Sequence, residues 1–179
     1  MFGEGTRFIR LAEDHEFKPF DCEDSDLNEF LLEDSKAYLQ EHLAVVYLVE
    51  NDQDTIAFFS VANDRISVED FSTNSQYNKF KKSTFASAKH FKSYPAVKIG
   101  RFGVDKNYSR SGLGSKLMNY IKYWFIDNNK TGCRFITVDA YNKPEALNFY
   151  KKNKFSFLTD TDVGQKTRAM YFDLMRFTT

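Results

Sequence analysis

The spacing of apolar residues divides the first third of the chain into a strand, a helix and two further strands. The apolar positions of TRFIRL (6–11) are typical of a strand, and those of 22–42 recur at about 3.6 residues, which predicts a helix. Its acidic stretch 24–26 offers N-caps at the positive end of the helix dipole. The apolar stripe of this helix consists of Leu27, Phe30, Leu31 and Tyr38. Strand-like runs at 44–50 and 55–63 flank the polar sequence NDQD, so we expect an antiparallel hairpin.

The rest of the chain follows an order of strand, helix, strand and helix. After a basic segment that we expect to form a short helix and a loop, the predicted elements are a strand at 96–104, a helix at 111–129, a strand at 134–140, a helix at 143–153 and strands at 155–159 and 168–175. The helix at 111–129 has an apolar stripe formed by Leu117, Met118, Ile121 and Phe125. A β-meander followed by this order predicts an α/β (α+β) fold with a mixed sheet flanked by helices.

Length and composition favour one domain in a reducing compartment. With 179 residues and three prolines, the chain is expected to form a single domain over 1–179, with the basic segment at about 66–96 as an insertion. Cys22 and Cys133 lack metal-ligand spacing, so we expect free thiols and no metal. The sequence shows neither a signal peptide nor a membrane span, which predicts a cytoplasmic protein without a membrane partner.

Charge is distributed unevenly although the formal net charge is zero. Residues 1–54 carry 15 acidic and 4 basic side chains, which leaves 10 acidic and 21 basic ones for the remainder. Within the basic part, residues 77–98 contain six lysines and no carboxylate. Such a segment is typical of a solvated surface loop, and it also suits an anionic partner such as nucleic acid.

A glycine-containing turn joins the strand at 96–104 to the helix at 111–129. Main-chain N–H groups at the start of a helix lack intrahelical acceptors, and glycine lets an anion approach them. The sequence SRSGLGS (109–115) could therefore hold a pyrophosphate, with Arg110 adding charge. The P-loop and dinucleotide-binding patterns do not fit, because Ser115 precedes Lys116 and a third glycine is missing. On spacing alone, an ordinary turn at the start of a helix fits equally well.

The segment VDKNYSRSGLGSKLM (104–118) resembles the acyl-CoA-binding motif of the GNAT acetyltransferase superfamily, usually written (Q/R)-x-x-G-x-(G/A). The motif positions correspond to Ser109, Arg110, Ser111, Gly112, Leu113 and Gly114. Ser109 stands where the family prefers Gln or Arg. A second segment, YNKPEALNFYKKNKF (141–155), is similar to the family's N-x-x-A-x-x-x-Y-x-K-x-G-F block. Tyr150 and Phe155 are in register there, whereas Asn142 lies one residue early and Lys154 replaces the usual Gly.

The resemblance implies the GNAT acyl-CoA N-acyltransferase fold, a mixed and mostly antiparallel sheet with a splayed parallel strand pair, 98–104 and 134–140. Acetyl-CoA would enter between these strands, and backbone of Phe102, Gly103 and Val104 would pair with its pantetheine arm. Gly103 would either keep that edge accessible or form a β-bulge. The implied cofactor-binding residues, with no metal, are Phe102, Gly103, Val104, Ser109, Arg110, Ser111, Gly112, Leu113, Gly114, Ser115 and Asn142.

Direct attack of a primary amine on the thioester is the chemistry that the resemblance implies. Tyr150 holds the position of the general acid, and a phenol can protonate the departing thiolate. Packing of Tyr150 in the core beside Phe149 is its alternative role. The motif strand offers no base, and the candidates elsewhere are Glu69, Asp70, His90 and Asp139. The missing base favours an acceptor that is partly neutral, such as an α-amine of pKa about 8 rather than a lysine of pKa about 10.4.

The segments 20–38 and 99–118 together look like the GNAT branch whose toxins acetylate the amino acid on charged tRNA. An aminoacyl ester presents an α-amine, and the basic segment offers lysines for tRNA phosphates. These lysines are Lys79, Lys81, Lys82, Lys89 and Lys92. A small metabolite is the other acceptor compatible with the sequence. A homodimer and an antitoxin-like partner are further possible partners.

Two other classes of function are compatible with the sequence. A non-catalytic acyl-CoA sensor or regulatory protein would keep the same fold, and the altered positions Ser109 and Lys154 suit it. A basic surface module whose glycine turn is only structural would need no cofactor. Tyr150 favours the enzyme, an acyltransferase that transfers groups other than aminoacyl groups.

Overall fold

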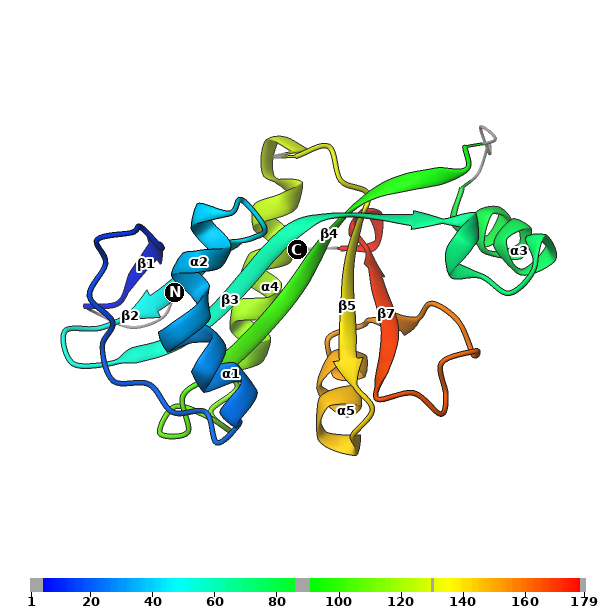
Figure 1. Cartoon of the computed structure of the whole chain (residues 1–179). Helices are drawn as coiled ribbons and strands as arrows, with labels where there is room; N and C mark the ends of the chain where they lie inside the picture. Colours follow the sequence, from blue (N-terminus) through cyan, green and yellow to red (C-terminus); the bar gives the residue numbers. More distant parts are fainter. Residues whose placement is uncertain (1–4, 86–90, 130, 178–179) are drawn as a thin grey trace. The chain divides into compact units, whose positions relative to one another are not determined.

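The computed structural model describes residues 5–85, 91–129 and 131–177, whose helices and strands are labelled in Figure 1. The seven strands in this part of the chain follow the order β1-β2-β3-β4-β5-β7-β6. Their bounds are β1 Arg7–Arg10, β2 Val45–Glu50, β3 Thr55–Ser67, β4 Ser93–Val104, β5 Phe135–Tyr141, β6 Ser156–Phe157 and β7 Thr167–Asp173. The pairs β1–β2, β2–β3, β5–β7 and β6–β7 are antiparallel, whereas β4 and β5 run parallel. The expected mixed, mostly antiparallel sheet is therefore confirmed.

The helices lie close to the predicted positions. Their bounds are α1 Ser25–Glu29, a π-helical turn Phe30–Asp34, α2 Ser35–Gln40, α3 Asn74–Thr84, α4 Leu113–Ile126 and α5 Pro144–Lys152. No helix in the described part of the chain is both long and apolar enough to cross a membrane. Contacts between residues divide the chain into two compact units, Met1–Ala62 with Ile99–Tyr120, and Asn63–Lys98 with Ile121–Thr179.

The first unit is built on the β2–β3 hairpin and the helical segment Ser25–Gln40. The hairpin pairs Leu48 with Phe58 across the two strands, and Asn51 Oδ1 accepts the N–H groups of Gln53 and Asp54 in the turn, each at 2.7 Å. Side chains of the hairpin and the helical segment share one apolar core. Its buried members are Leu11, Phe20, Phe30, Leu31, Val46, Leu48 and Phe58.

The helical segment Ser25–Gln40 follows the prediction at its start and departs from it later. Asp24 caps the helix as expected, since Leu27 N–H donates to Asp24 Oδ1 at 3.1 Å. Tyr38 was expected on the apolar stripe, but it is 36% exposed while Ser35 is fully buried. The π-helical turn inserts extra backbone and rotates the residues that follow it around the helix axis, so a stripe predicted with a constant 3.6 period is wrong there.

The second unit combines β5, β7 and α5 with the basic helix α3. Strands β5 and β7 pair in register from Phe135 with Asp173 to Tyr141 with Thr167. A second apolar cluster is largely aromatic, and its buried members are Ile66, Tyr77, Phe80, Tyr94, Ala96 and Phe135. The apolar stripe predicted for α4 is confirmed within the two units, because its four side chains are at most 2% exposed.

Candidate active site

The loop from Asp105 to Gly112 connects the end of β4 to the start of α4. Two of its residues adopt the left-handed backbone conformation, Arg110 with φ +58° and Gly112 with φ +82°. A Cβ built on Gly112 would have no neighbour within 4 Å, so the backbone conformation and not packing requires the glycine. The strand, turn and helix predicted around the motif are therefore present.

The N-terminus of α4 has the charge of an anion-binding site. Helices commonly begin with acidic residues because these interact favourably with the positive end of the dipole, but α4 has none in its first turn. Instead the exposed Lys116 lies in that turn and the exposed Arg110 precedes it. Positive side chains, free space at Gly112 and the helix dipole together suit an anion such as a pyrophosphate.

The serines of the motif turn their hydroxyl groups into the loop. Ser109 Oγ donates to the carbonyl of Lys106 at 2.9 Å, and Ser111 Oγ donates to that of Tyr108 at 2.7 Å. Leu113 N–H in turn points to Ser111 Oγ at 3.4 Å. Ser109 thus shapes the loop at the position where the family prefers Gln or Arg, and its contact with a cofactor stays a prediction.

Gly103, on the strand that leads into the loop, is required by packing. A Cβ at this position would lie 2.7 Å from Cε1 of Phe58 and 3.1 Å from Cζ of Phe20. The sequence suggested an accessible edge or a β-bulge, and neither explanation includes this contact. The half-buried Phe102 and Val104 flank Gly103. Pairing of these three residues with the pantetheine arm stays a prediction.

Tyr150 lies in the second unit, on α5, whose first residue is Pro144. Its ring makes edge contacts with Phe149 and Phe155, with centroids 5.2 and 5.3 Å apart. Burial raises the pKa of the Tyr150 phenol well above its usual value. The phenol is therefore protonated throughout the physiological range, which is the form that a general acid must have.

Asn142, at the end of β5, has a structural role in the second unit. Its Nδ2 donates to the carbonyls of Val163 at 2.8 Å and Gln165 at 3.0 Å, and its backbone N–H donates to Lys166 O at 2.9 Å. The side chain thereby fixes the loop that leads into β7. These contacts do not test whether Asn142 also binds the cofactor, and that role stays a prediction.

Three of the four candidate bases are engaged in other contacts. Glu69 forms an exposed ion pair with Arg65 at 2.6 Å, and Asp70 accepts from the backbone and side chain of Ser67. Asp139 is paired with Lys98. His90 lies outside the described residues. Among the candidates that the structure describes, each carboxylate has a local structural partner, so none is assigned as the base.

The basic segment exposes fewer of its lysines to solvent than its sequence suggests. Lys79 and Lys82 on α3 and Lys92 before β4 are exposed. Lys81 is only 8% exposed, and its Nζ lies 4.9 Å from the centre of the Tyr77 ring. A cation placed over an aromatic ring in this way supports packing. Lys81 is therefore not a phosphate ligand in this conformation, and Lys89 lies outside the described residues.

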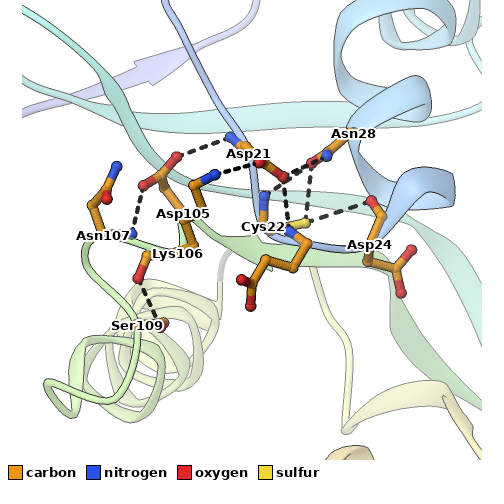
Figure 2. Close-up of polar contacts among 9 residues, drawn as sticks. Asp21, Cys22, Asp24, Asn28, Asp105, Lys106, Asn107 and Ser109 are labelled. Carbon is orange, nitrogen blue, oxygen red and sulfur yellow. Dashed lines mark hydrogen bonds and ion pairs between the residues drawn. The ribbon is translucent and has the colours of Figure 1, made fainter.

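A polar network around Asp21 and Asp105 was missed by the sequence analysis (Figure 2). Asp105 is the first residue after β4 and is 4% exposed, and Asp21 precedes α1. Backbone N–H of Asp21 donates to Asp105 Oδ2 at 2.9 Å, and Lys106 Nζ donates to Asp21 Oδ2 at 2.8 Å. The sequence does show an acidic residue directly after each of the apolar residues Phe20 and Val104. Spacing along the chain cannot show that these two acidic residues lie close together in the fold.

Comparisons with known proteins identify the family of the chain. Residues 42–156 match the family model for the acetyltransferase (GNAT) domain, and the chain therefore belongs to the GNAT acetyltransferase family. Acetyl-CoA is accordingly its cosubstrate. No curated protein matches the chain.

Several solved structures share the fold at low sequence identity. A mutant of the toxin AtaT bound to the C-terminus of the antitoxin AtaR is 17% identical with a TM-score of 0.71, covering 95% of this chain and 92% of that one. AtaTR bound with acetyl-CoA is 18% identical with a TM-score of 0.74, covering 97% and 96%. AtaT complexed with acetyl-methionyl-tRNAfMet is 20% identical with a TM-score of 0.70, covering 95% of each chain. At these identities the likeness establishes the fold.

Proposed function

We propose that the chain, as one domain over residues 1–179, transfers the acetyl group of acetyl-CoA to a primary amine by direct attack. The loop before α4 carries this proposal, because left-handed backbone at Arg110 and Gly112 leads into a helix start without acidic residues. Main-chain amides from Arg110 to Ser115 hold the pyrophosphate, and the cations of Arg110 and Lys116 add to the attraction. The altered position Ser109 then matters little, since side chains are not the principal ligands.

Tyr150 is the general acid in this proposal. The amine nitrogen forms the new C–N bond as the C–S bond breaks, and the phenol gives its proton to the departing sulfur. The amine loses one proton to solvent, and the Tyr150 phenolate regains one from solvent. The support is that Tyr150 holds the position of the acid in the family motif and that two aromatic contacts fix its ring. The transferred group is acetyl and not aminoacyl.

The acceptor is the α-amine of an aminoacyl-tRNA. Such an amine is partly neutral at physiological pH and needs no dedicated base, which suits the structural contacts made by Glu69, Asp70 and Asp139. The exposed Lys79, Lys82 and Lys92 supply charge for phosphates. The similar toxin AtaT is known in complex with acetyl-methionyl-tRNAfMet. A tRNA acceptor also implies that the enzyme acts in the cytoplasm.

Acetyl transfer to charged tRNA tests the acceptor directly. The purified protein is incubated with labelled acetyl-CoA and bulk charged tRNA, with uncharged tRNA and free amino acids as controls. We expect label in the charged RNA, and mild alkaline hydrolysis of the aminoacyl ester should release it as an N-acetylamino acid. Label in free amino acids but not in RNA would move the acceptor to the small metabolites.

Binding of coenzyme A separates an acetyl-CoA protein from a basic surface module. At about a hundred times its dissociation constant, the ligand should stabilise the fold by about 2.7 kcal/mol. A melting temperature that does not change with coenzyme A would contradict the placement of the cofactor. A shift without transfer to any amine would favour the non-catalytic sensor.

Two protein partners are also part of the proposal. AtaT binds the antitoxin AtaR, and we propose an antitoxin-like partner for this chain as well as a homodimer. Light scattering of the purified protein across a concentration series gives its mass, and a monomer at every concentration would refute the homodimer.

A further inference from the structure

The loop that leads to the glycines is fixed at its first residue by a buried carboxylate. Asp105 Oδ1 accepts the N–H of Asn107 at 2.8 Å, and Oδ2 accepts the N–H of Asp21 at 2.9 Å. The N–H of Asp105 itself donates to Ile56 O on β3 at 2.9 Å. One side chain thus joins the loop to a segment more than eighty residues away in the sequence. Charge-assisted bonds of this kind are stronger than those between neutral groups.

The side chain of Asp21 accepts further hydrogen bonds in the same network (Figure 2). Its Oδ1 accepts from Asn28 Nδ2 and from the backbone of Glu23, each at 2.9 Å, while Oδ2 accepts from Lys106 Nζ. The N–H of Lys106 donates to the carbonyl of Asp21 at 2.8 Å. Lys106 lowers the pKa of the Asp21 carboxyl, so this carboxylate stays ionised at neutral pH.

The loop is also held at Tyr108, by the turn between β2 and β3. Tyr108 OH donates to Asp54 Oδ2 at 2.9 Å and accepts from Asn51 Nδ2 at 2.9 Å. The carbonyl of Tyr108 accepts from Ser111 Oγ, one residue before Gly112. The contacts therefore extend from two distant segments of the chain to the residue before Gly112. Within the first unit, the loop is fixed at 105, 106 and 108.

We propose that Asp105 and Asp21 are positioning residues that hold this loop in the conformation that binds the pyrophosphate of acetyl-CoA, an inference that rests on the function proposed above. A flexible loop would lose conformational freedom when the cofactor binds, and this loss weakens binding. A loop that is already ordered avoids it. The two carboxylates thus favour the binding of an anion although they are anionic themselves.

Replacing either Asp by Asn should change the affinity for coenzyme A, and the direction of this change distinguishes a positioning role from simple electrostatics. Asn in place of either Asp removes one negative charge near a site for an anion, which by charge alone would tighten the binding of coenzyme A. Positioning predicts the opposite. In Asp105→Asn, one of the two N–H groups faces an amide NH₂ instead of an oxygen, so one bond is lost and the loop is released.

The experiment measures the dissociation constant of coenzyme A by calorimetry, well below the melting temperature of every variant. For Asp105→Asn we expect about tenfold weaker binding, with a higher KM for acetyl-CoA and unchanged kcat at saturation. Asp21→Asn and Tyr108→Phe should weaken binding severalfold, and they test the inference independently if Asp105→Asn does not fold. The control is Asp173→Asn, a buried carboxylate in the second unit that accepts from Arg134 and from Met175 N–H.

The control variant should lose stability without losing affinity for coenzyme A. If the wild type binds coenzyme A and the loop variants bind it equally or more tightly, the positioning role is refuted while the proposed function stands. If the wild type does not bind coenzyme A, the proposed cofactor site fails and this inference fails with it.

Discussion

The loop before α4 and the end of α5 around Tyr150 are held in different ways. Polar groups fix the loop, because Asp105, Asp21 and Tyr108 bond to backbone and side chains from distant segments. Aromatic rings surround Tyr150, and Phe155 approaches it after the helix has ended. In the proposed function, the first region acts through main-chain groups and the second through one side chain. We therefore expect a departure from the family motif to be tolerated at Ser109 more easily than a change at Tyr150.

Loss of the Tyr150 hydroxyl should have the largest effect on catalysis. In Tyr150→Phe the ring keeps its contacts with Phe149 and Phe155, but no proton reaches the departing sulfur. General acid catalysis contributes about 10²- to 10⁴-fold, so we expect kcat to fall by that factor. Steady-state kinetics and coenzyme A calorimetry on the same variant give kcat and affinity separately. Unchanged turnover would remove Tyr150 as the general acid.

A buried lysine beneath the end of α5 makes the second region sensitive to pH. Lys122 on α4 is 1% exposed, its Nζ donates to the carbonyl of Asn153, and it lies 4.0 Å from the centre of the Phe172 ring. Burial, with a contribution from Lys154, lowers the pKa of Lys122 to about 8. The folded protein therefore releases this proton at a lower pH than the unfolded chain, whose lysines titrate near pKa 10.4.

The contribution of Lys122 to the free energy of unfolding should consequently rise with pH between about 8 and 10.4. In this window the unfolded chain binds more protons than the folded protein, so Lys122 adds up to about 3 kcal/mol as the pH increases. Urea unfolding of the wild type and of Lys122→Met at several pH values isolates this term, because tyrosine titration is common to both. Lys152→Met, at an exposed position of α5, is the control and should keep the wild-type slope. Equal slopes in wild type and Lys122→Met would contradict the prediction.

Most of the fold could be predicted from the sequence because periodicity reports burial directly. The apolar stripe of α4 and the β2–β3 hairpin were correct for this reason. A prediction was wrong, or lacked a contact, where a local irregularity or a distant residue decides the outcome. The π-helical turn exposes Tyr38, and Phe58 requires Gly103 to lack a side chain. Neither effect leaves a periodic signal.

The candidate site was predictable in its backbone and less so in its polar side chains. The loop around Gly112 has the strand, turn and helix that its motif indicates. The partners of Asp21 and Asp105 could not be predicted, because they come from segments far apart in the chain. Lys81 looked like its exposed neighbours in the basic segment, and only the position of the Tyr77 ring shows that it is buried.

The smallest expected effect concerns the left-handed glycines. Gly112 and Gly132 have φ +82° and +70°, and a Cβ on either would have no neighbour within 4 Å. Alanine at each position should therefore cost the same backbone strain, about 1–2 kcal/mol, without a steric clash. Gly112→Ala should also weaken coenzyme A binding severalfold, because its Cβ stands where the pyrophosphate approaches. Gly132→Ala, in the second unit before β5, should lose stability alone. Equal affinity for coenzyme A in the two variants would mean that Gly112 serves the turn and not the cofactor.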